Sequence, residues 1–248
     1  MIIIKNDKEI EKMREAGKRL AFVHEEGAVY LKPGLSTYDI DMYALKKVKS
    51  TGGTPSFYML YDFPGNFCIS LNDEVIHGIP SRERILKSGD VLKIDGGVCY
   101  DGWQSDAART YIIGEGSEED KLLVERTKES FFKALEVCDI NHHVNDIGKA
   151  IEDYIINFDY GIVDDYTGHG IGMNVHEDPE VPNFTCTTRG AKLRHNMTLA
   201  IEPMITLGTH KIKVDKDGWT VRTQDGKNSA HYENTVLITE NGPEILTL

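Results

Sequence analysis

The stretch from Val91 to Ile113, VLKIDGGVCYDGWQSDAARTYII, limits the possible folds of this chain more than any other part of its sequence. Two runs of β-branched and aliphatic residues flank Asp101-Gly102. Asp-Gly between two such runs is a strong indication of a hairpin with a two-residue turn. We therefore expect an antiparallel strand pair that folds back on itself at these two residues.

The turn decides which residues face each other across the hairpin. Asp95 is expected opposite Ala108, and Gly97 opposite Asp106. Because side chains alternate between the two faces of a strand, Asp95 and Asp106 then share one face as diagonal neighbours. Two carboxylates among aliphatic residues repel each other and resist desolvation unless a positive charge lies between them. The hairpin alone leaves two interpretations open: a solvated face with two unrelated acids, or part of a cation site.

The composition is that of a globular protein, with 248 residues of which 40% are hydrophobic and 27% are charged. A chain of this length can bury a full hydrophobic core, and no linker, charge block or low-complexity segment interrupts it. We therefore expect a single domain over residues 1–248. The formal net charge of -12 argues against a surface that binds phosphate backbones, so no direct contact with nucleic acid is expected.

The N-terminal sequence and the cysteines both indicate a protein of the cytoplasm. The apolar run at the start, MIIIKND, is too short for a signal peptide or a membrane span, so no membrane partner is expected. The cysteines have no CxxC spacing, which argues against a Cys-rich zinc module and favours reduced thiols. They are Cys68, Cys99, Cys138 and Cys186.

Apolar residues at helical spacing predict four helices that cover the strands. The helices are expected to begin at Asn6 or Asp7, Ser36 or Thr37, Ser117 and Val144, and to end near Lys32-Pro33-Gly34, Gly52-Gly53, Cys138 and Ile156. Strands are expected at Phe67–Leu71, Met197–Leu207 and Ser229–Glu240. His24, on the first helix, is expected to be solvated.

Two segments outside these elements contain histidines among glycines. TGHGIGMNVHEDP, from Thr167 to Pro179, places three glycines around His169 and has His176 seven residues further on. Glycines there indicate backbone brought close to another group, although a simple glycine-rich turn is the alternative. The GHGIG spacing is not the GxGxxG fingerprint of a dinucleotide site. His77, in VIHGIP, reads locally as a structural histidine.

The two halves of the chain repeat the same chemistry. GDVLKID, which ends at Asp95, parallels NMTLAIE, which ends at Glu202, and SDAART around Asp106 parallels HYENT around Glu233. Each half has helical segments before an antiparallel strand pair, and each pair carries two carboxylates. If the halves pack about a pseudo-two-fold axis, these four carboxylates converge at the middle.

Four carboxylates in one pocket cannot all stay charged without cations. With His169 added, the set offers mostly oxygen donors and one imidazole, which suits Mn²⁺, Fe²⁺, Co²⁺ or Zn²⁺ better than Ca²⁺ or a closed structural zinc site. Too many carboxylates for one ion implies sharing between two metals, ~3.5–4 Å apart. Such a pair ionises a water near neutral pH and polarises a carbonyl, so hydrolytic chemistry is predicted.

The ligand candidates Asp95, Asp106, His169, Glu202 and Glu233, in that order, resemble the five-ligand dimetal site of the methionine aminopeptidases, a metallopeptidase family. The resemblance extends over nearly the whole chain, through CISLNDEVIHGIP, LKIDGGVCYDGWQSD, GHGIGMNVHEDP, AIEPM and DGWTVRTQDGKNSAHYENT. The length resembles the short bacterial type I form. The resemblance implies an α+β protein with the pita-bread (creatinase/aminopeptidase) fold, in which duplicated α/β halves surround a central antiparallel sheet covered by helices.

By this resemblance, Asp106 and Glu233 bridge two divalent ions, Asp95 binds one of them, and His169 and Glu202 complete the other. The ligands accept Co, Mn, Fe or Zn and do not identify the native metal. Glu202 is also implied to shuttle a proton.

The resemblance further implies a substrate site beside the metals. His77 would contact the nitrogen of the scissile amide, and His176 would stabilise the substrate carbonyl or the tetrahedral intermediate. The narrow apolar pocket for the first side chain would be lined by Phe63, Cys68 and Trp219, together with Leu60 and Val175.

Three residues depart from common usage in the family. Val175 stands where an aromatic residue is usual, so the exact shape of the pocket is not implied. His231 stands where Gln is usual, and Asn234 where His is common. His231 lies two residues from Glu233 on the same strand face, where it would support a metal ligand. None of these changes removes a ligand.

The implied activity is that of a methionyl aminopeptidase, an enzyme that removes the initiator methionine from nascent proteins when the second residue is small. Water activated by two metal ions attacks the first peptide bond. Its partners would be deformylated nascent N-termini, with the chain associated with the ribosome in the cytoplasm, and we expect a monomer.

Two other interpretations remain from the sequence. The first is a proline-specific aminopeptidase or dipeptidase of the same fold, but these usually carry an additional N-terminal domain. The second is a metal-free pita-bread protein that binds peptide or RNA, but such proteins typically lose ligands, whereas all five are present here.

Overall fold

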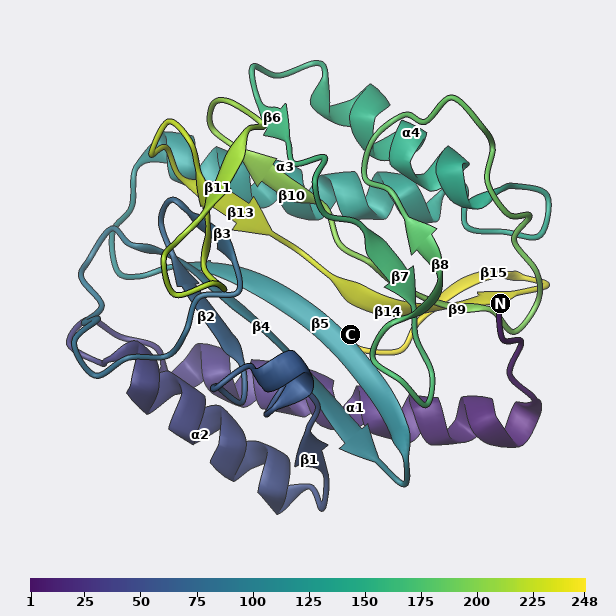
Figure 1. The fold of residues 1–248 in the computed structure, drawn as a ribbon, viewed down its shortest axis with the longest axis horizontal. Coiled ribbons are helices and arrows are strands. Elements are labelled where there is room, and N and C mark those ends of the chain that lie inside the picture. Colours follow the sequence, from purple (N-terminus) through teal and green to yellow (C-terminus); the bar gives the residue numbers. More distant parts are fainter.

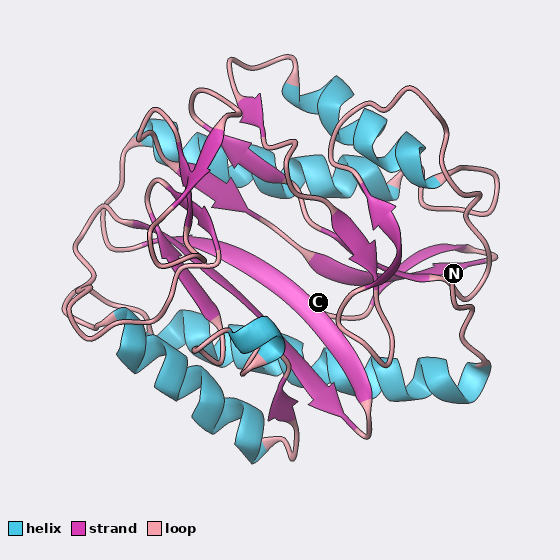
Figure 2. Ribbon diagram, in the orientation of Figure 1, coloured by secondary structure: helices cyan, strands magenta, loops and turns pink.

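The computed structural model describes residues 1–248. Two pairs of helices enclose a set of strands, with α1 and α2 along one side and α3 and α4 along the other (Figures 1 and 2). The helices are α1 (Asp7–Tyr30), α2 (Thr37–Ser50), α3 (Glu118–Leu135) and α4 (Val144–Ile155), with a single 3-10 turn, η1 (Leu60–Asp62). No helix combines the length and the apolar run that crossing a bilayer requires.

The predicted helix starts are confirmed by their caps. The Asn6 side chain accepts hydrogen bonds from the backbone amides of Lys8 and Glu9. At the start of α2, the Ser36 side chain accepts a hydrogen bond from the backbone amide of Asp39. In both helices the third residue returns a carboxylate to the cap's own backbone, which forms a capping box. Caps of this kind satisfy amides that have no partner inside the helix.

The expectation that His24 is solvated was wrong. The side chain is buried, with 5% of its surface exposed, and its Nε2 lies 3.0 Å from the carbonyl oxygen of Ala107. The reason is that α1 continues to Tyr30, so His24 lies one turn after Leu20 on the buried face. Burial lowers the pKa of His24 to about 3.

All strand pairs are antiparallel, and the strands form four sheets. In the first sheet β4 lies between β1 and β2 and also pairs with β5; the others have the orders β13-β10-β6, β11-β12-β3 and β15-β14-β9-β7-β8. The strands are β1 (Thr54–Pro55), β2 (Cys68–Leu71), β3 (Glu74–Ile76), β4 (Val91–Tyr100), β5 (Trp103–Ile112), β6 (Gly161–Ile162), β7 (Gly168–Gly170), β8 (Glu177–Val181), β9 (Thr198–Ile201), β10 (Met204–Thr206), β11 (Ile212–Val214), β12 (Val221–Thr223), β13 (Ser229–His231), β14 (Asn234–Thr239) and β15 (Gly242–Ile245).

The hairpin of β4 and β5 has the predicted turn and register. Asp101 and Gly102 both have positive φ angles, 49° and 79°, as a two-residue turn of this twist requires. Asp95 pairs with Ala108, and Asp106 pairs with the glycine two residues after Asp95. The two aspartates therefore lie on one face of the hairpin, as the alternation of side chains predicted.

The two long strands expected in the last quarter are each interrupted in the middle. Met197–Leu207 contains β9 and β10, separated by Glu202-Pro203, and Ser229–Glu240 contains β13 and β14, separated by Tyr232-Glu233. Proline lacks the amide hydrogen that a strand ladder needs, which accounts for the first break. Each break contains one of the glutamates, so the change of direction aims a carboxylate out of the sheet.

Each half of the chain has its own apolar core. A cluster that includes Leu20, Phe67 and Ile94 joins α1 and α2 to the β4–β5 hairpin. A larger cluster that includes Phe131 and Leu199 joins α3 and α4 to the strands of the second half. The carboxylates of the two halves meet between these cores.

Candidate metal centre

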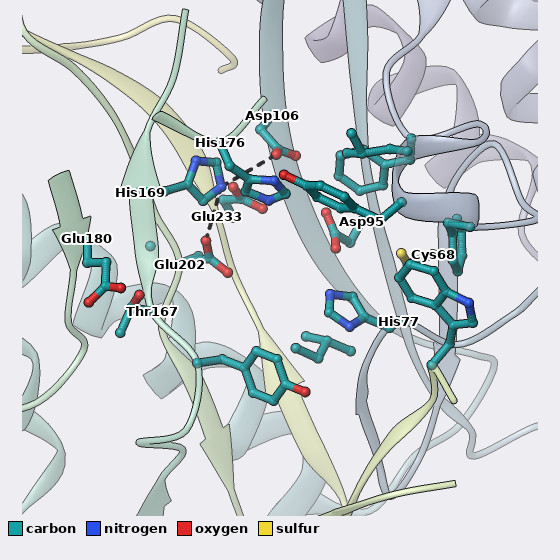
Figure 3. A pocket seen from close by; sticks show the side chains of 18 residues that line it. Cys68, His77, Asp95, Asp106, Thr167, His169, His176, Glu180, Glu202 and Glu233 are labelled. Carbon is teal, nitrogen blue, oxygen red and sulfur yellow. Dashed lines mark ion pairs between the residues drawn. The ribbon is translucent and has the colours of Figure 1, made fainter. Parts of the chain in front are cut away.

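The five predicted ligand residues converge on one cavity of about 330 Å³ (Figure 3). Asp95 comes from β4, Asp106 from β5 and His169 from β7, while Glu202 and Glu233 come from the two strand breaks. The hairpin thus supplies two carboxylates from the first half of the chain, and the second half supplies the rest. Only in the folded chain are these side chains neighbours.

The imidazole of His169 faces two of the carboxylates. Its Nε2 lies 3.5 Å from Oε1 of Glu202 and 3.8 Å from Oδ2 of Asp106, which are the dashed contacts in Figure 3. Its Nδ1 lies 2.9 Å from the carbonyl oxygen of Gly170. Because a carbonyl only accepts hydrogen bonds, Nδ1 carries the proton, and the lone pair of Nε2 points at the carboxylates. This is the tautomer that a metal-binding histidine uses.

Burial raises the pKa of all four carboxyl groups among the candidate ligands. Desolvation raises the pKa of Asp95 to about 7. The pKa of Asp106 is raised by burial and then by the charge of Asp95, and those of Glu202 and Glu233 by burial and then by the charge of Asp106. Four such groups repel one another unless a cation lies among them.

The donor atoms themselves fit a divalent cation. Oδ1 of Asp95, Oδ1 of Asp106 and Oε1 of Glu233 are buried and have no hydrogen-bond partner. Buried polar atoms without a partner are rare in folded proteins, and each calls for an explanation such as a bound ion. Oxygen donors with one imidazole nitrogen suit the first-row transition metals named above. Asp106, His169 and Glu233 each offer a ligand atom within 4.8 Å of the others.

His231 also lies against this centre. Its Nε2 is 3.7 Å from Oε2 of Glu202 and 4.0 Å from Oε2 of Glu233, and neither ring nitrogen has a hydrogen-bond partner. Sequence reasoning singled it out from its spacing to Glu233. Asn234, in contrast, faces away from the cavity and accepts a hydrogen bond of 2.7 Å from Arg109.

The two other predicted histidines line the same cavity. His77 follows β3 with a φ angle of 58°, a backbone conformation that costs energy outside glycine. Burial lowers the pKa of His77 to about 4, so its ring is neutral at physiological pH. His176 is exposed, with its ring centroid 4.5 Å from that of His169 and 5.8 Å from that of Tyr61.

An apolar pocket adjoins the carboxylates. Phe63, Cys68 and Trp219 line the cavity together with Leu60, while Val175 packs behind them. Sequence reasoning missed three further aromatic lining residues, Phe57, Tyr61 and Tyr166. Tyr166 directly precedes the glycine-rich segment that begins at Thr167, so its place in the sequence gives a signal. Nothing in the local sequence marks the other two.

Comparison with known proteins gives consistent results. The sequence model of metallopeptidase family M24 matches residues 11–240. A methionine aminopeptidase of Clostridium acetobutylicum is 52% identical over 100% of this chain and 99% of its own length. The crystal structure of methionine aminopeptidase from Thermotoga maritima superposes with a TM-score of 0.97 at 41% identity, covering 100% of this chain and 99% of that one. Prolidase from Pyrococcus furiosus shares the fold, with a TM-score of 0.79 at 24% identity, but this chain covers only 65% of it. The pita-bread fold expected from the sequence is confirmed.

Proposed function

Because the chain belongs to metallopeptidase family M24 and, within it, to the methionine aminopeptidases, we propose that it removes the N-terminal methionine of nascent proteins whose second residue is small. Membership of this family makes the chain a metal-dependent aminopeptidase, which hydrolyses a peptide bond. The observation that carries the proposal for this cavity is the set of buried carboxylate oxygens without partners.

The cavity would hold two divalent ions, of Co, Mn, Fe or Zn. Asp106 and Glu233 would bridge them, Asp95 would bind one, and His169 and Glu202 would complete the other. The orientation of the His169 lone pair and the raised pKa values of the carboxyl groups support this assignment. Two ions held in this way lower the pKa of a water and polarise a carbonyl when they are bound.

The protein's own groups would then position the peptide and move protons. Glu202 would accept the proton of the attacking water and pass it to the leaving amine, because burial raises its pKa and makes its carboxylate a stronger base. Neutral His77 would contact the nitrogen of the scissile amide. His176, beside His169 and open to solvent, would donate a hydrogen bond to the substrate carbonyl oxygen.

The apolar pocket would select methionine by shape and polarisability. Phe63 and Trp219 lie edge to face, with ring centroids 5.1 Å apart, and offer aromatic edges and faces to a thioether. Cys68, which is buried, forms the base of the pocket. Burial and the charge of Asp95 raise the pKa of the Cys68 thiol well above its usual range, so the thiol stays neutral and adds no charge to an apolar wall.

The cellular setting follows from the substrate. New polypeptides appear at the ribosome, so the enzyme would act in the cytoplasm on deformylated N-termini as they emerge. The four free cysteines agree with a reducing compartment. We propose one catalytic domain over residues 1–248, since both halves of the chain supply candidate ligands to one cavity. We also propose that the protein is a monomer and that it does not bind nucleic acid or membrane directly.

The test is the release of methionine from Met-Ala-Ser by the metal-free protein after addition of Mn²⁺ or Co²⁺. An X-Pro peptide, assayed in parallel, distinguishes a proline-specific relative, and metal analysis after reconstitution distinguishes a peptide-binding protein without metal. Rapid release from Met-Ala-Ser alone is expected. A folded sample that cleaves no Met peptide with any divalent metal would refute the proposal.

A further inference from the structure

Lys5 and Glu177 form a buried ion pair that the proposed reaction does not use. The Nζ atom of Lys5 lies 2.8 Å from Oε2 of Glu177, and only 1% and 4% of the two side chains are exposed. The same Nζ also donates to the carbonyl oxygen of Ile3 at 3.2 Å. Two charges lose their hydration on burial, and two apolar side chains of similar size would often give equal stability. The pair therefore calls for an explanation other than stability.

The pair joins the segment before α1 to the loop that carries His176. Lys5 precedes the first residue of α1 by two positions, and its backbone amide donates to the carbonyl oxygen of Asn196 at 3.2 Å. Glu177 is the first residue of β8 and directly follows His176, which lines the cavity. A contact at Glu177 therefore acts on the backbone next to His176.

The two carboxylate oxygens of Glu177 have different partners. Oε2 is held by Lys5, whereas Oε1 accepts a hydrogen bond of 3.3 Å from the backbone amide of Asn174. The carbonyl oxygen of Asn174 in turn accepts from the amide of Gly172 at 3.0 Å, which closes a tight turn. Because a carboxylate is planar and rigid, an ion pair that fixes Oε2 also fixes the oxygen atom that holds the turn.

The backbone of the loop lies directly against the ion pair. A Cβ atom on Gly172 would lie 2.5 Å from Oε1 of Glu177 and 2.7 Å from Cε of Lys5, so a larger residue here would displace the pair. The carbonyl oxygen of Gly172 accepts a hydrogen bond of 2.8 Å from the amide of Gln104 in β5. The turn is thus held between the ion pair and the hairpin.

We propose that Lys5 and Glu177 are positioning residues for the reaction, which fix the loop of residues 172–176 and so hold the ring of His176 where the substrate carbonyl arrives. The carboxylate of Glu177 holds the turn, and Lys5 supplies the charge that keeps this carboxylate buried and oriented. The role of His176 rests on the proposed function. The order of the loop does not, because it can be measured without turnover.

Three variants separate the effect of the pair on the loop from its effect on stability. Lys5→Met leaves the carboxylate of Glu177 without a partner, so this group should turn toward water and release the turn. Adding Glu177→Gln restores a neutral acceptor for the amide of Asn174, whereas adding Glu177→Met instead removes the acceptor altogether. Neither double variant has a buried unpaired charge, so both keep the test open if Lys5→Met alone does not fold.

Hydrogen exchange of the Mn²⁺-loaded full chain, read by mass spectrometry on a peptide that covers residues 172–177, measures the order of the loop. Exchange should be about 10-fold faster than in the wild type in Lys5→Met and in Lys5→Met/Glu177→Met, and within about threefold of the wild type in Lys5→Met/Glu177→Gln. Leu20→Ala, in the first core, is the control, which should lower the Tm by about 5–15 °C without changing exchange in this peptide. Wild-type exchange in Lys5→Met/Glu177→Met would overturn the proposal.

Turnover of Met-Ala-Ser shows whether the loop acts through His176. Lys5→Met/Glu177→Met should lower kcat about 10–100-fold and keep KM within about threefold of the wild type, because a misplaced donor is missed in the transition state. In a His176→Ala background the same two changes should cost less than about twofold, since the ring that they position is gone. The full loss in that background as well would overturn the proposal. A wild type that releases no methionine would refute the proposed function, and exchange of the loop would still test the pair.

Discussion

A carboxylate that is buried without a hydrogen-bond donor destabilises a protein, and three carboxyl groups of the centre have such an oxygen atom: Asp95, Asp106 and Glu233. At the scale of single residues, this cost falls on the side chains that surround the place a cation would occupy. Burial shifts the histidines in the opposite direction. It lowers the pKa of His77 and His169 and so keeps their rings neutral. Neutral rings can accept a metal or a proton, which charged rings cannot.

We expect the metal-free protein to lose stability as the pH rises from about 4 to about 7. Burial raises the pKa of Asp95 from 3.8 to about 7, so the folded state holds a proton that the unfolded state has already released. The stability from that proton is fully present below the unfolded pKa and is lost as the pH passes the folded pKa. For Asp95 this is on the order of 4 kcal/mol.

Urea unfolding with a chelator, at several pH values across this window, measures the effect. Asp95→Asn keeps the shape of the side chain without its titration, and the pH slope of this variant should be shallower than that of the wild type. Equal slopes for the two proteins would show that Asp95 is not the group responsible. Added Mn²⁺ should oppose the loss, because it favours the charged carboxylates.

His77→Ala should slow the release of methionine about 10²–10³-fold while metal content stays nearly unchanged, because His77 is placed to contact the peptide and not the ions. Turnover of Met-Ala-Ser and metal analysis of the same sample give the two values. His195→Ala, at an exposed histidine away from the cavity, is the control and should change neither. Loss of metal from His77→Ala would contradict the assigned role.

At the scale of the elements, the hairpin was predictable, whereas only Pro203 gives a local signal for a strand break, and the direction of the chain at both breaks was not predictable. Asp-Gly and the alternation of side chains were sufficient to place Asp95 and Asp106 on one face. The sequence of the second half reads as continuous strands, because hydrophobic alternation persists through Glu202 and Glu233. The breaks depend on packing between distant segments, such as the 3.3 Å hydrogen bond from the Tyr232 amide to the Pro203 carbonyl. Local sequence does not contain that information.

The glycine at position 96 leaves room in the hairpin for the ring of Phe67. A Cβ atom on Gly96 would lie 2.1 Å from the ring of Phe67, which is fully buried. We expect Gly96→Ala to lower the free energy of unfolding by about 3 kcal/mol, because the ring has no space into which it can move. Phe67→Leu should recover part of this loss in the double variant, as measured by urea unfolding.

Gly102→Ala is the control for this cycle, since nothing lies within 4 Å of a Cβ atom at that position. Its φ angle of +79° makes it mildly destabilising, by about 1 kcal/mol, and its effect should add to that of Phe67→Leu. Additivity in the Gly96 cycle as well would mean that the ring and the glycine do not compete for space.

At the scale of the whole molecule, the two halves are joined around the centre by the backbone of Glu233. Its amide donates to the carbonyl of Ala108 at 3.0 Å, and its carbonyl accepts from Arg109 at 2.5 Å. The duplication of helices and strand pairs was visible in the sequence, and so was the order of the ligands. The joining contacts were not, because each of them ends on a backbone carbonyl, which carries no sequence signature.

Arg109→Lys should therefore weaken both stability and metal binding. The guanidinium group of Arg109 also donates to Asn234 at 2.7 Å and to the carbonyl of Thr247 at 2.9 Å, and a single ammonium group cannot reach all these acceptors. A loss of about 2 kcal/mol in unfolding free energy and weaker Mn²⁺ affinity are expected. Arg126→Lys, at a surface arginine bonded to Tyr160, should leave Mn²⁺ affinity unchanged. Equal Mn²⁺ affinities for the two variants would exclude a role for Arg109 at the centre.

The division of the centre between two halves sets an order of events while the chain is being made. The hairpin with Asp95 and Asp106 is synthesised long before Glu202 and Glu233 exist. During that interval its two carboxylates have no counterpart, and they can remain hydrated because the second core is not yet there to cover them. A centre built from these residues is complete only after residue 233 has been added, so full metal binding by the proposed ligands would mark a chain whose synthesis has passed that point.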